Sequence, residues 1–175
     1  MILSDREIRA EIADGHIRFA PDIDIDSQVQ DASVDVRLGH NLRMPAHLEG
    51  QILKPSERIP HELQGELVTI PHGGHNLEPQ EFVLGHTYEK ITLPLHLSAR
   101  LEGKSSLARL GLMIHFTSAH IAPGWDGIII LEILNHGPNT IALVPEMPIG
   151  QVVFEKLSML PKKAYSGRYR GQLEP

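Results

Sequence analysis

Along most of the chain, apolar residues alternate with polar ones at a period of two, the spacing of a half-buried β-strand. Residues 34–38 read Val-Asp-Val-Arg-Leu and are followed by Gly39. Further strands are predicted over Leu67–Ile70, Glu81–Leu84, Tyr88–Leu93, Met113–Phe116, Gly127–Asn135, Thr140–Val144 and Ile149–Leu157. Proline and glycine separate these segments at short intervals, so the pattern predicts a mainly β domain built as a barrel or sandwich. The polar stretch from Pro45 to Pro79 predicts loops with at most short strands.

One segment near the start carries the signals of a helix. Ser4-Asp5-Arg6-Glu7 is a capping box, in which the Ser4 hydroxyl and the Glu7 carboxylate each serve the other residue's backbone amide. Leu3 and Ile8 occupy the two positions of a hydrophobic staple. Gly15 supplies a left-handed stop, so we expect a helix of about three turns.

Composition sets the broad class of the protein. A chain of 175 residues, 41% hydrophobic and 22% charged, suits one soluble globular domain. The absence of cysteine excludes disulfides, thiolate metal sites and a cysteine nucleophile. No apolar run is long enough to span a membrane and the first residues do not resemble a signal peptide, so we expect a cytoplasmic protein without membrane contact.

Charge is distributed unevenly around the net value of −6. Lys162, Lys163, Arg168 and Arg170 face Glu174 alone in the last fifteen residues, so the rest of the chain is strongly acidic. An acidic body argues against nucleic-acid binding, which needs a basic face. We expect residues 1–160 to form the β domain and residues 161–175 a separate flexible tail, which is either a solvated end or a flap that folds over an anion.

Residues 103–111, GKSSLARLG, resemble the end of a Walker A phosphate loop. The spacing excludes that motif, because Ser98 stands where its first glycine should be. Ser105 or Ser106 can instead cap a short helical turn whose free amides attract phosphate, with Lys104 at its mouth and Arg109 on the same face as Ser105. The alternative is an ordinary capped turn on the surface.

The segment Gly127–Asn135 contains one carboxylate in an isoleucine-rich run. Alternation places Ile128, Ile130, Glu132 and Leu134 on one face of the strand. Desolvation there would raise the pKa of Glu132 towards neutrality, where a carboxyl group can both accept and donate a proton. Glu132 is therefore a catalytic candidate, unless this is an edge strand with Glu132 in solvent.

The eleven histidines do not form a recognisable metal motif. No His-Glu-x-x-His is present, and the absence of cysteine excludes the Pro-Cys-x-x-Cys half of the zinc nucleobase-deaminase signature. We therefore predict no metal-ligating residues and no zinc.

These segments together resemble the dCTP deaminases, trimeric relatives of dUTPase. The central block GKSSLARLGLMIHFTSAHIAPGWDGIIILEILN (residues 103–135) is the most specific match. Further matches follow the family's order: ILSDREI at 2–8, VQDASVDVRLG at 29–39, PEMPIGQVVFEKL at 145–157 and YSGRYRGQ at 165–172. The resemblance covers most of the chain.

The resemblance implies a distorted β-barrel or jelly roll of the dUTPase-like type, assembled as a homotrimer with sites between neighbouring subunits. It implies zinc-independent hydrolysis of dCTP to dUTP and ammonia, with Mg²⁺ carried by the triphosphate and with dTTP as a feedback inhibitor. Glu132 would be the general base and acid, and Ser105 and Arg109 would orient the water and the base. The positions that match substrate contacts are Lys104, Ser105, Ser106, Leu107, Ala108, Arg109, Ala122, Ile130, Leu131, Glu132, Gln151, Tyr165, Arg168 and Gln172.

Three positions depart from the family pattern. Ala122 replaces an aspartate that holds the deoxyribose 3′-hydroxyl, His120 stands where arginine is common, and Lys104 replaces an arginine. The sequence thus leaves several alternatives open: a bifunctional enzyme that releases dUMP, a dUTPase proper, an enzyme for a modified nucleotide, or a nucleotide-binding regulator that retains the fold.

Overall fold

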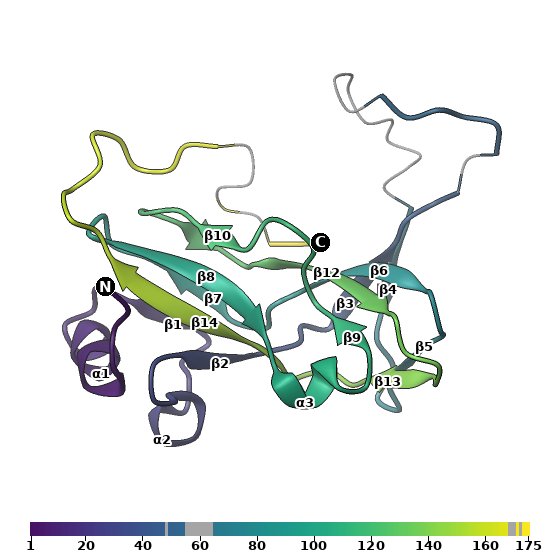
Figure 1. Ribbon diagram of the computed structural model, residues 1–175, viewed down its shortest axis with the longest axis horizontal. Coiled ribbons are helices and arrows are strands. Elements are labelled where there is room, and N and C mark those ends of the chain that lie inside the picture. The colour runs from purple at the N-terminus through teal and green to yellow at the C-terminus, as the bar shows by residue number, and fades with distance from the viewer. Residues whose placement is uncertain (48, 55–64, 168–170, 172) are drawn as a thin grey trace.

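The computed structural model describes residues 1–47, 49–54, 65–167, 171 and 173–175 (Figure 1). Its helices are α1 (Asp5–Ala13), α2 (Ile25–Gln28) and α3 (Ser105–Ala108). Its strands are β1 (Arg18–Ala20), β2 (Val34–Arg37), β3 (Asn41–Met44), β4 (Glu66–Thr69), β5 (His75–Leu77), β6 (Phe82–His86), β7 (Lys90–Thr92), β8 (Leu97–Gly103), β9 (Leu112–Met113), β10 (His120–Ile121), β11 (Asp126–Gly127), β12 (Ile130–Asn135), β13 (Ile141–Leu143) and β14 (Pro148–Lys156). The predicted mainly β class is confirmed.

Within the described residues, the strands form four antiparallel sheets rather than one closed barrel. The largest has the order β4-β3-β6-β12-β9, and the next has the order β10-β8-β14-β2. Smaller sheets are β1-β7-β11 and β13-β5. Fully buried residues from both large sheets, including Leu101, Leu131 and Phe154, belong to one continuous core. This arrangement agrees with a jelly roll, without full closure.

Helix α1 begins and ends as predicted, although its nine residues fall short of three turns. The capping box is present, and the Ser4 amide donates to Glu7 Oε2 at 2.9 Å. Gly15 adopts a φ of +72°, which lets the chain reverse after the last turn. The amides of His16 and Ile17 then both donate to the carbonyl of Glu11. In the part of the chain that the structure describes, no helix is long and apolar enough to cross a membrane.

The predicted strands are confirmed at β2, β4, β6, β7, β13 and β14, with shifted ends, whereas the strand predicted over Met113–Phe116 shares only Met113 with β9. The predicted run Gly127–Asn135 is divided into β11 and β12. Strand β8 was not predicted, yet it is central in its sheet, between β10 and β14. Its apolar residues Leu97, Ala99 and Leu101 alternate along the strand and are buried, so the period-two signal was present.

Candidate active site

Glu132 lies on β12, in the largest sheet. Strand β12 pairs with β6 from Ile130 to Leu134, and with β9 at Leu134 and Asn135. Leu131 and Ile133 are fully buried, whereas Glu132 lies on the other face, which is half-buried. One face of β12 therefore joins the core, and the face of Glu132 borders an open hollow.

This hollow has a volume of about 410 Å³ and is lined by Phe82, Leu84, Phe116, Thr117 and Glu132. The two phenylalanine rings meet edge to face at 5.7 Å, and they are 39% and 44% exposed. The Glu132 carboxylate is the one ionisable group of the lining. The amide of Phe116 donates to its Oε2 at 2.8 Å, so the fold orients a single carboxylate inside an apolar rim.

The turn α3 is helical as predicted, but its predicted serine cap is wrong. Lys104 occupies the N-cap position, and its side chain makes no capping hydrogen bond to this turn. The carbonyl of Lys104 accepts from the amides of Leu107 and Ala108. Ser105, Ser106, Ala108 and Arg109 are exposed and Leu107 is half-buried. Their side chains are therefore free to meet a ligand or another subunit.

Lys104 and Gln151, both predicted to contact the nucleotide, lie next to the same glycine. Gln151 on β14 donates through Nε2 to the carbonyl of Gly103 at 3.4 Å and accepts from the Ser33 hydroxyl at 2.9 Å. Lys104 Nζ lies 2.6 Å from Asp35 Oδ2. Sequence reasoning missed Asp35, although the alternation at 34–38 placed it on the polar face of β2.

Ala122 and the C-terminal segment meet at the turn before β11. The amide of Trp125 donates to the carbonyl of Ala122 at 3.1 Å, and the amide of Tyr165 donates to that of Pro123 at 3.0 Å. The rings of Trp125 and Tyr165 lie 5.3 Å apart. Tyr165 thus packs beside the turn that carries Ala122. Arg168 and Gln172 lie outside the described residues, and the flap remains a prediction.

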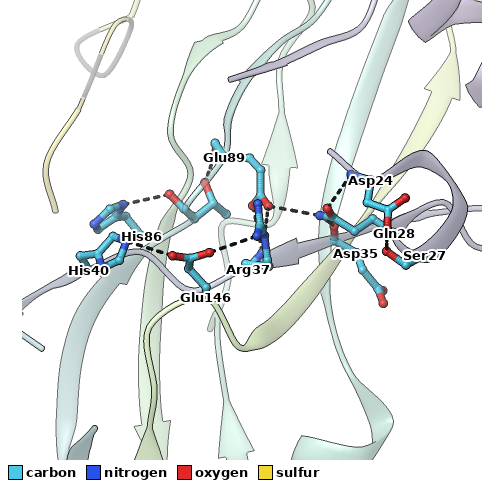
Figure 2. Close-up of polar contacts among 10 residues, drawn as sticks. Asp24, Ser27, Gln28, Asp35, Arg37, His40, His86, Glu89 and Glu146 are labelled. Atoms are coloured by element: carbon cyan, nitrogen blue, oxygen red, sulfur yellow. Dashed lines mark hydrogen bonds and ion pairs between the residues drawn. The ribbon is translucent and has the colours of Figure 1, made fainter. Parts of the chain in front are cut away.

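A second polar network lies within the fold and links β2 to the turn between β6 and β7 (Figure 2). Glu89 is fully buried and accepts from the Arg37 amide at 2.9 Å, from Arg37 Nε at 2.7 Å and from Gln28 Nε2 at 3.2 Å. Arg37 Nη1 also contacts Glu146, whose carboxylate lies 3.5 Å from His40 Nε2. Because a buried carboxylate is costly unless it is paired, this network is structural.

A family model described as dCTP deaminase-like matches residues 2–157, nearly the whole chain. The chain belongs to this family. A relative from Beutenbergia cavernae, named "dCTP deaminase, dUMP-forming", is 44% identical over 180 residues, covering 100% of this chain and 92% of the relative. A relative from Alteromonas mediterranea, named "dCTP deaminase", is 39% identical over 183 residues, and the match covers 98% of this chain and 92% of the relative.

A solved structure supports the same fold for this member of the dCTP deaminase-like family. The 2′-deoxycytidine 5′-triphosphate deaminase of Agrobacterium tumefaciens is 28% identical, with a TM-score of 0.66. The match covers 89% of this chain and 48% of the other, so this chain spans about half the length of that protein. The predicted fold class is confirmed by this likeness.

Within this dCTP deaminase-like chain, the predicted site residues fall into three separate places. Ile130 and Leu131 precede Glu132 on β12 and share its strand. Among the described residues, no hydrogen bond joins Glu132 to Ser105 or Arg109, and neither residue lines the hollow. Lys104 is the N-cap of α3, Gln151 on β14 contacts the preceding Gly103, and Ala122 and Tyr165 lie at the turn before β11.

Proposed function

We propose that this enzyme hydrolyses the amino group from the cytosine of dCTP and then releases dUMP. The observation that carries the proposal is Glu132, a lone carboxylate oriented by the Phe116 amide in an otherwise uncharged hollow. The names of the relatives support the substrate. The hollow offers an apolar surface for a planar base, and the carboxylate offers a proton acceptor at its wall.

In the deamination step, Glu132 takes a proton from a water molecule. The resulting hydroxide bonds to carbon 4 of the cytosine, and Glu132 passes its proton to ring nitrogen 3. Glu132 then takes the proton of the new hydroxyl group and gives it to the amino group, so that the carbon–nitrogen bond breaks, ammonia leaves and the carbonyl of uracil forms. The balance is dCTP plus water to dUTP plus ammonia. Because Glu132 activates the water itself, the step needs no thiolate-bound zinc, and deamination should survive a zinc-selective chelator.

The relatives favour dUMP over dUTP as the released product. The relatives from Beutenbergia cavernae and Kocuria rhizophila, 44% and 42% identical, are both named dUMP-forming. A second water would attack the α-phosphorus of dUTP and release pyrophosphate, with Mg²⁺ brought by the triphosphate. Gln151 and Lys104, adjacent at Gly103, would hold this end of the nucleotide.

We further propose that neighbouring subunits of a homotrimer complete each site. Phe82 and Phe116 leave an apolar rim beside Glu132, and they are 39% and 44% exposed. The exposed Ser105 begins α3 and the exposed Arg109 is its C-cap, and neither residue lines the hollow of its own chain. Assembly would cover the rim and bring the partner subunit's Arg109 to the hollow.

The alternative of a nucleotide-binding regulator rests on Ala122, because an alanine side chain cannot accept a hydrogen bond from a deoxyribose hydroxyl. A weakened sugar contact would also suit a modified nucleotide. The regulator would bind a nucleotide without turnover, whereas the enzyme for a modified nucleotide would differ from the proposal in the nucleotide that it turns over.

One experiment separates these functions. The purified protein is incubated with Mg²⁺ and dCTP, CTP, dUTP or a 5-substituted dCTP, and nucleotides, ammonia and pyrophosphate are resolved and quantified. We expect ammonia and dUMP from dCTP, and slower release when dTTP is added. Ammonia with dUTP as the end product would limit the proposal to its first step. Binding of dCTP or dTTP without any product from any nucleotide would overturn the enzyme proposal in favour of the regulator.

A further inference from the structure

We propose that Glu11, His16 and His96 form a binding site for a divalent transition-metal ion of the zinc type. One ligand atom from each residue lies within 4.8 Å of the other two. Among the described residues, this is the one such group of three histidine or carboxylate ligands. None of the three residues lines the hollow around Glu132, and metal binding at this cluster would not require the proposed reaction.

The two imidazoles converge on the Glu11 carboxylate from different sides. His16 Nδ1 lies 2.9 Å from Glu11 Oε2. His96 Nε2 lies 3.1 Å from Oε1 and 3.0 Å from Oε2. Ligand atoms around a tetrahedral zinc ion with bonds of about 2.0–2.1 Å are about 3.3 Å apart, close to these spacings. Small side-chain rotations would therefore admit an ion between the three groups.

The backbone holds the three residues in place. Glu11 lies in the last turn of α1, and its carbonyl accepts from the amides of His16 and Ile17, which fixes the loop that carries His16. His96 directly precedes β8, and its carbonyl accepts from the amide of Leu157, just after β14. Rigid elements of this kind give a metal site a defined geometry.

The donor set selects the class of ion. Two imidazole nitrogens and one carboxylate suit zinc, cobalt or nickel, whereas Mg²⁺ prefers oxygen ligands alone. The side chains of His16, Glu11 and His96 are 51%, 21% and 30% exposed, so water can reach the ion and fill the remaining coordination. The protein's other histidine–carboxylate contacts in the described residues, such as His40 with Glu146 at 3.5 Å, have a single imidazole each.

A bound ion would connect α1 to the start of β8, elements 85 residues apart in the chain. In Figure 1, α1 lies at one end of the molecule and β6, which contributes to the hollow, lies towards the other. Binding to the folded chain alone stabilises that chain, so the expected effect is on unfolding rather than on the reaction.

The test uses the full chain without an affinity tag, stripped of metal with a chelator. Cobalt(II) binding is followed by its visible absorption and zinc binding by calorimetry, with Mg²⁺ as the ion that should not bind here. We expect one cobalt or zinc ion per chain. Glu11→Gln and His96→Ala should each weaken binding by at least about tenfold. His72→Ala, an exposed histidine in another turn, is the matched control and should leave the affinity unchanged.

Thermal unfolding separates a metal site from a merely structural cluster. Zinc should raise the melting temperature of the wild type and of His72→Ala, and not that of Glu11→Gln. A structural role alone would change the melting temperature in chelator and leave the zinc-dependent shift intact. No stoichiometric cobalt binding by the wild type, or full binding by His96→Ala and Glu11→Gln, would overturn the proposal.

Discussion

The backbone amide of Phe116 donates a hydrogen bond to the carboxylate of Glu132, with 2.8 Å between the nitrogen and Oε2. The amide belongs to the loop after β9, and the amide of Glu132 donates in turn to the carbonyl of Ile114 in the same loop. Main chain, rather than another side chain, therefore sets the direction of the carboxylate. Substitutions around the hollow can change its walls without releasing Glu132.

If each site combines Glu132 of one subunit with Ser105 and Arg109 of another, two inactive variants should restore each other. Glu132→Gln and Arg109→Ala are each expected to be inactive alone. Dissociated and reassembled together at equal amounts, they should recover about a quarter of the wild-type activity, the share of mixed sites with both groups intact. Ammonia release before and after mixing measures this. If mixed trimers are shown to form and recover no activity, then Glu132, Ser105 and Arg109 of each site belong to one subunit.

The ion pair between Lys104 and Asp35 predicts a measurable stability effect. Both side chains are largely buried, at 24% and 15% exposure, and their atoms are 2.6 Å apart. Lys104→Met leaves the Asp35 carboxylate without its cation, which should lower the free energy of unfolding by about 1–3 kcal/mol. Urea denaturation measures the change.

The matched control for this pair is the double variant Lys104→Met with Asp35→Asn. It removes both charges, so it should recover part of the lost stability. A double variant that is no more stable than Lys104→Met would show that the pair does not account for the loss.

We expect that replacing Ala122 by the aspartate of the family pattern raises the affinity for dCTP. The residue lies at the turn before β11, beside the packed rings of Trp125 and Tyr165. Ala122→Asp should lower the KM for dCTP if the missing carboxylate weakens the hold on the deoxyribose. Steady-state kinetics with dCTP test this, with Ala122→Asn as the uncharged comparison. An unchanged KM in both variants would mean that the sugar is held elsewhere.

Local signals in the sequence predicted α1, α3 and most of the longer strands, but they did not predict α2, β1, β3, β8 or β10, and they did not predict the site's contacts. The capping box at Ser4 and the apolar run that forms β12 depend on neighbouring residues, and both were predictable. Lys104 meets Asp35 across 69 residues, and Glu11 meets His96 across 85, because strand pairing joins distant segments. The loop amide of Phe116 reaches Glu132 for the same reason, and periodicity carries no information about it.

The buried imidazole of His86 should make the free energy of unfolding depend on pH. Burial lowers the pKa of this imidazole in the folded chain, with a smaller contribution from nearby His40. The unfolded chain, with an ordinary histidine pKa of about 6.5, therefore takes up the proton first as pH falls. The associated stability is present at neutral pH and is lost between about pH 6.5 and the lower folded pKa, at up to about 1.4 kcal/mol per pH unit.

The variant His86→Gln isolates this effect, because glutamine does not titrate in this range. Urea unfolding from about pH 7.5 to about pH 5.5 should show a steeper loss of stability in the wild type than in the variant. Equal slopes in the two proteins would contradict the assignment to His86.

The most direct test of the central claim is the turnover of Glu132→Gln with dCTP. Glutamine keeps the size of the side chain and an oxygen that can accept from the Phe116 amide, but it cannot take a proton from water. Ammonia release gives kcat, and calorimetry gives the affinity for dCTP in the same preparation. We predict a fall in kcat of at least about a hundredfold, with a dCTP affinity close to that of the wild type. Deamination by Glu132→Gln at a rate near the wild type would contradict the account.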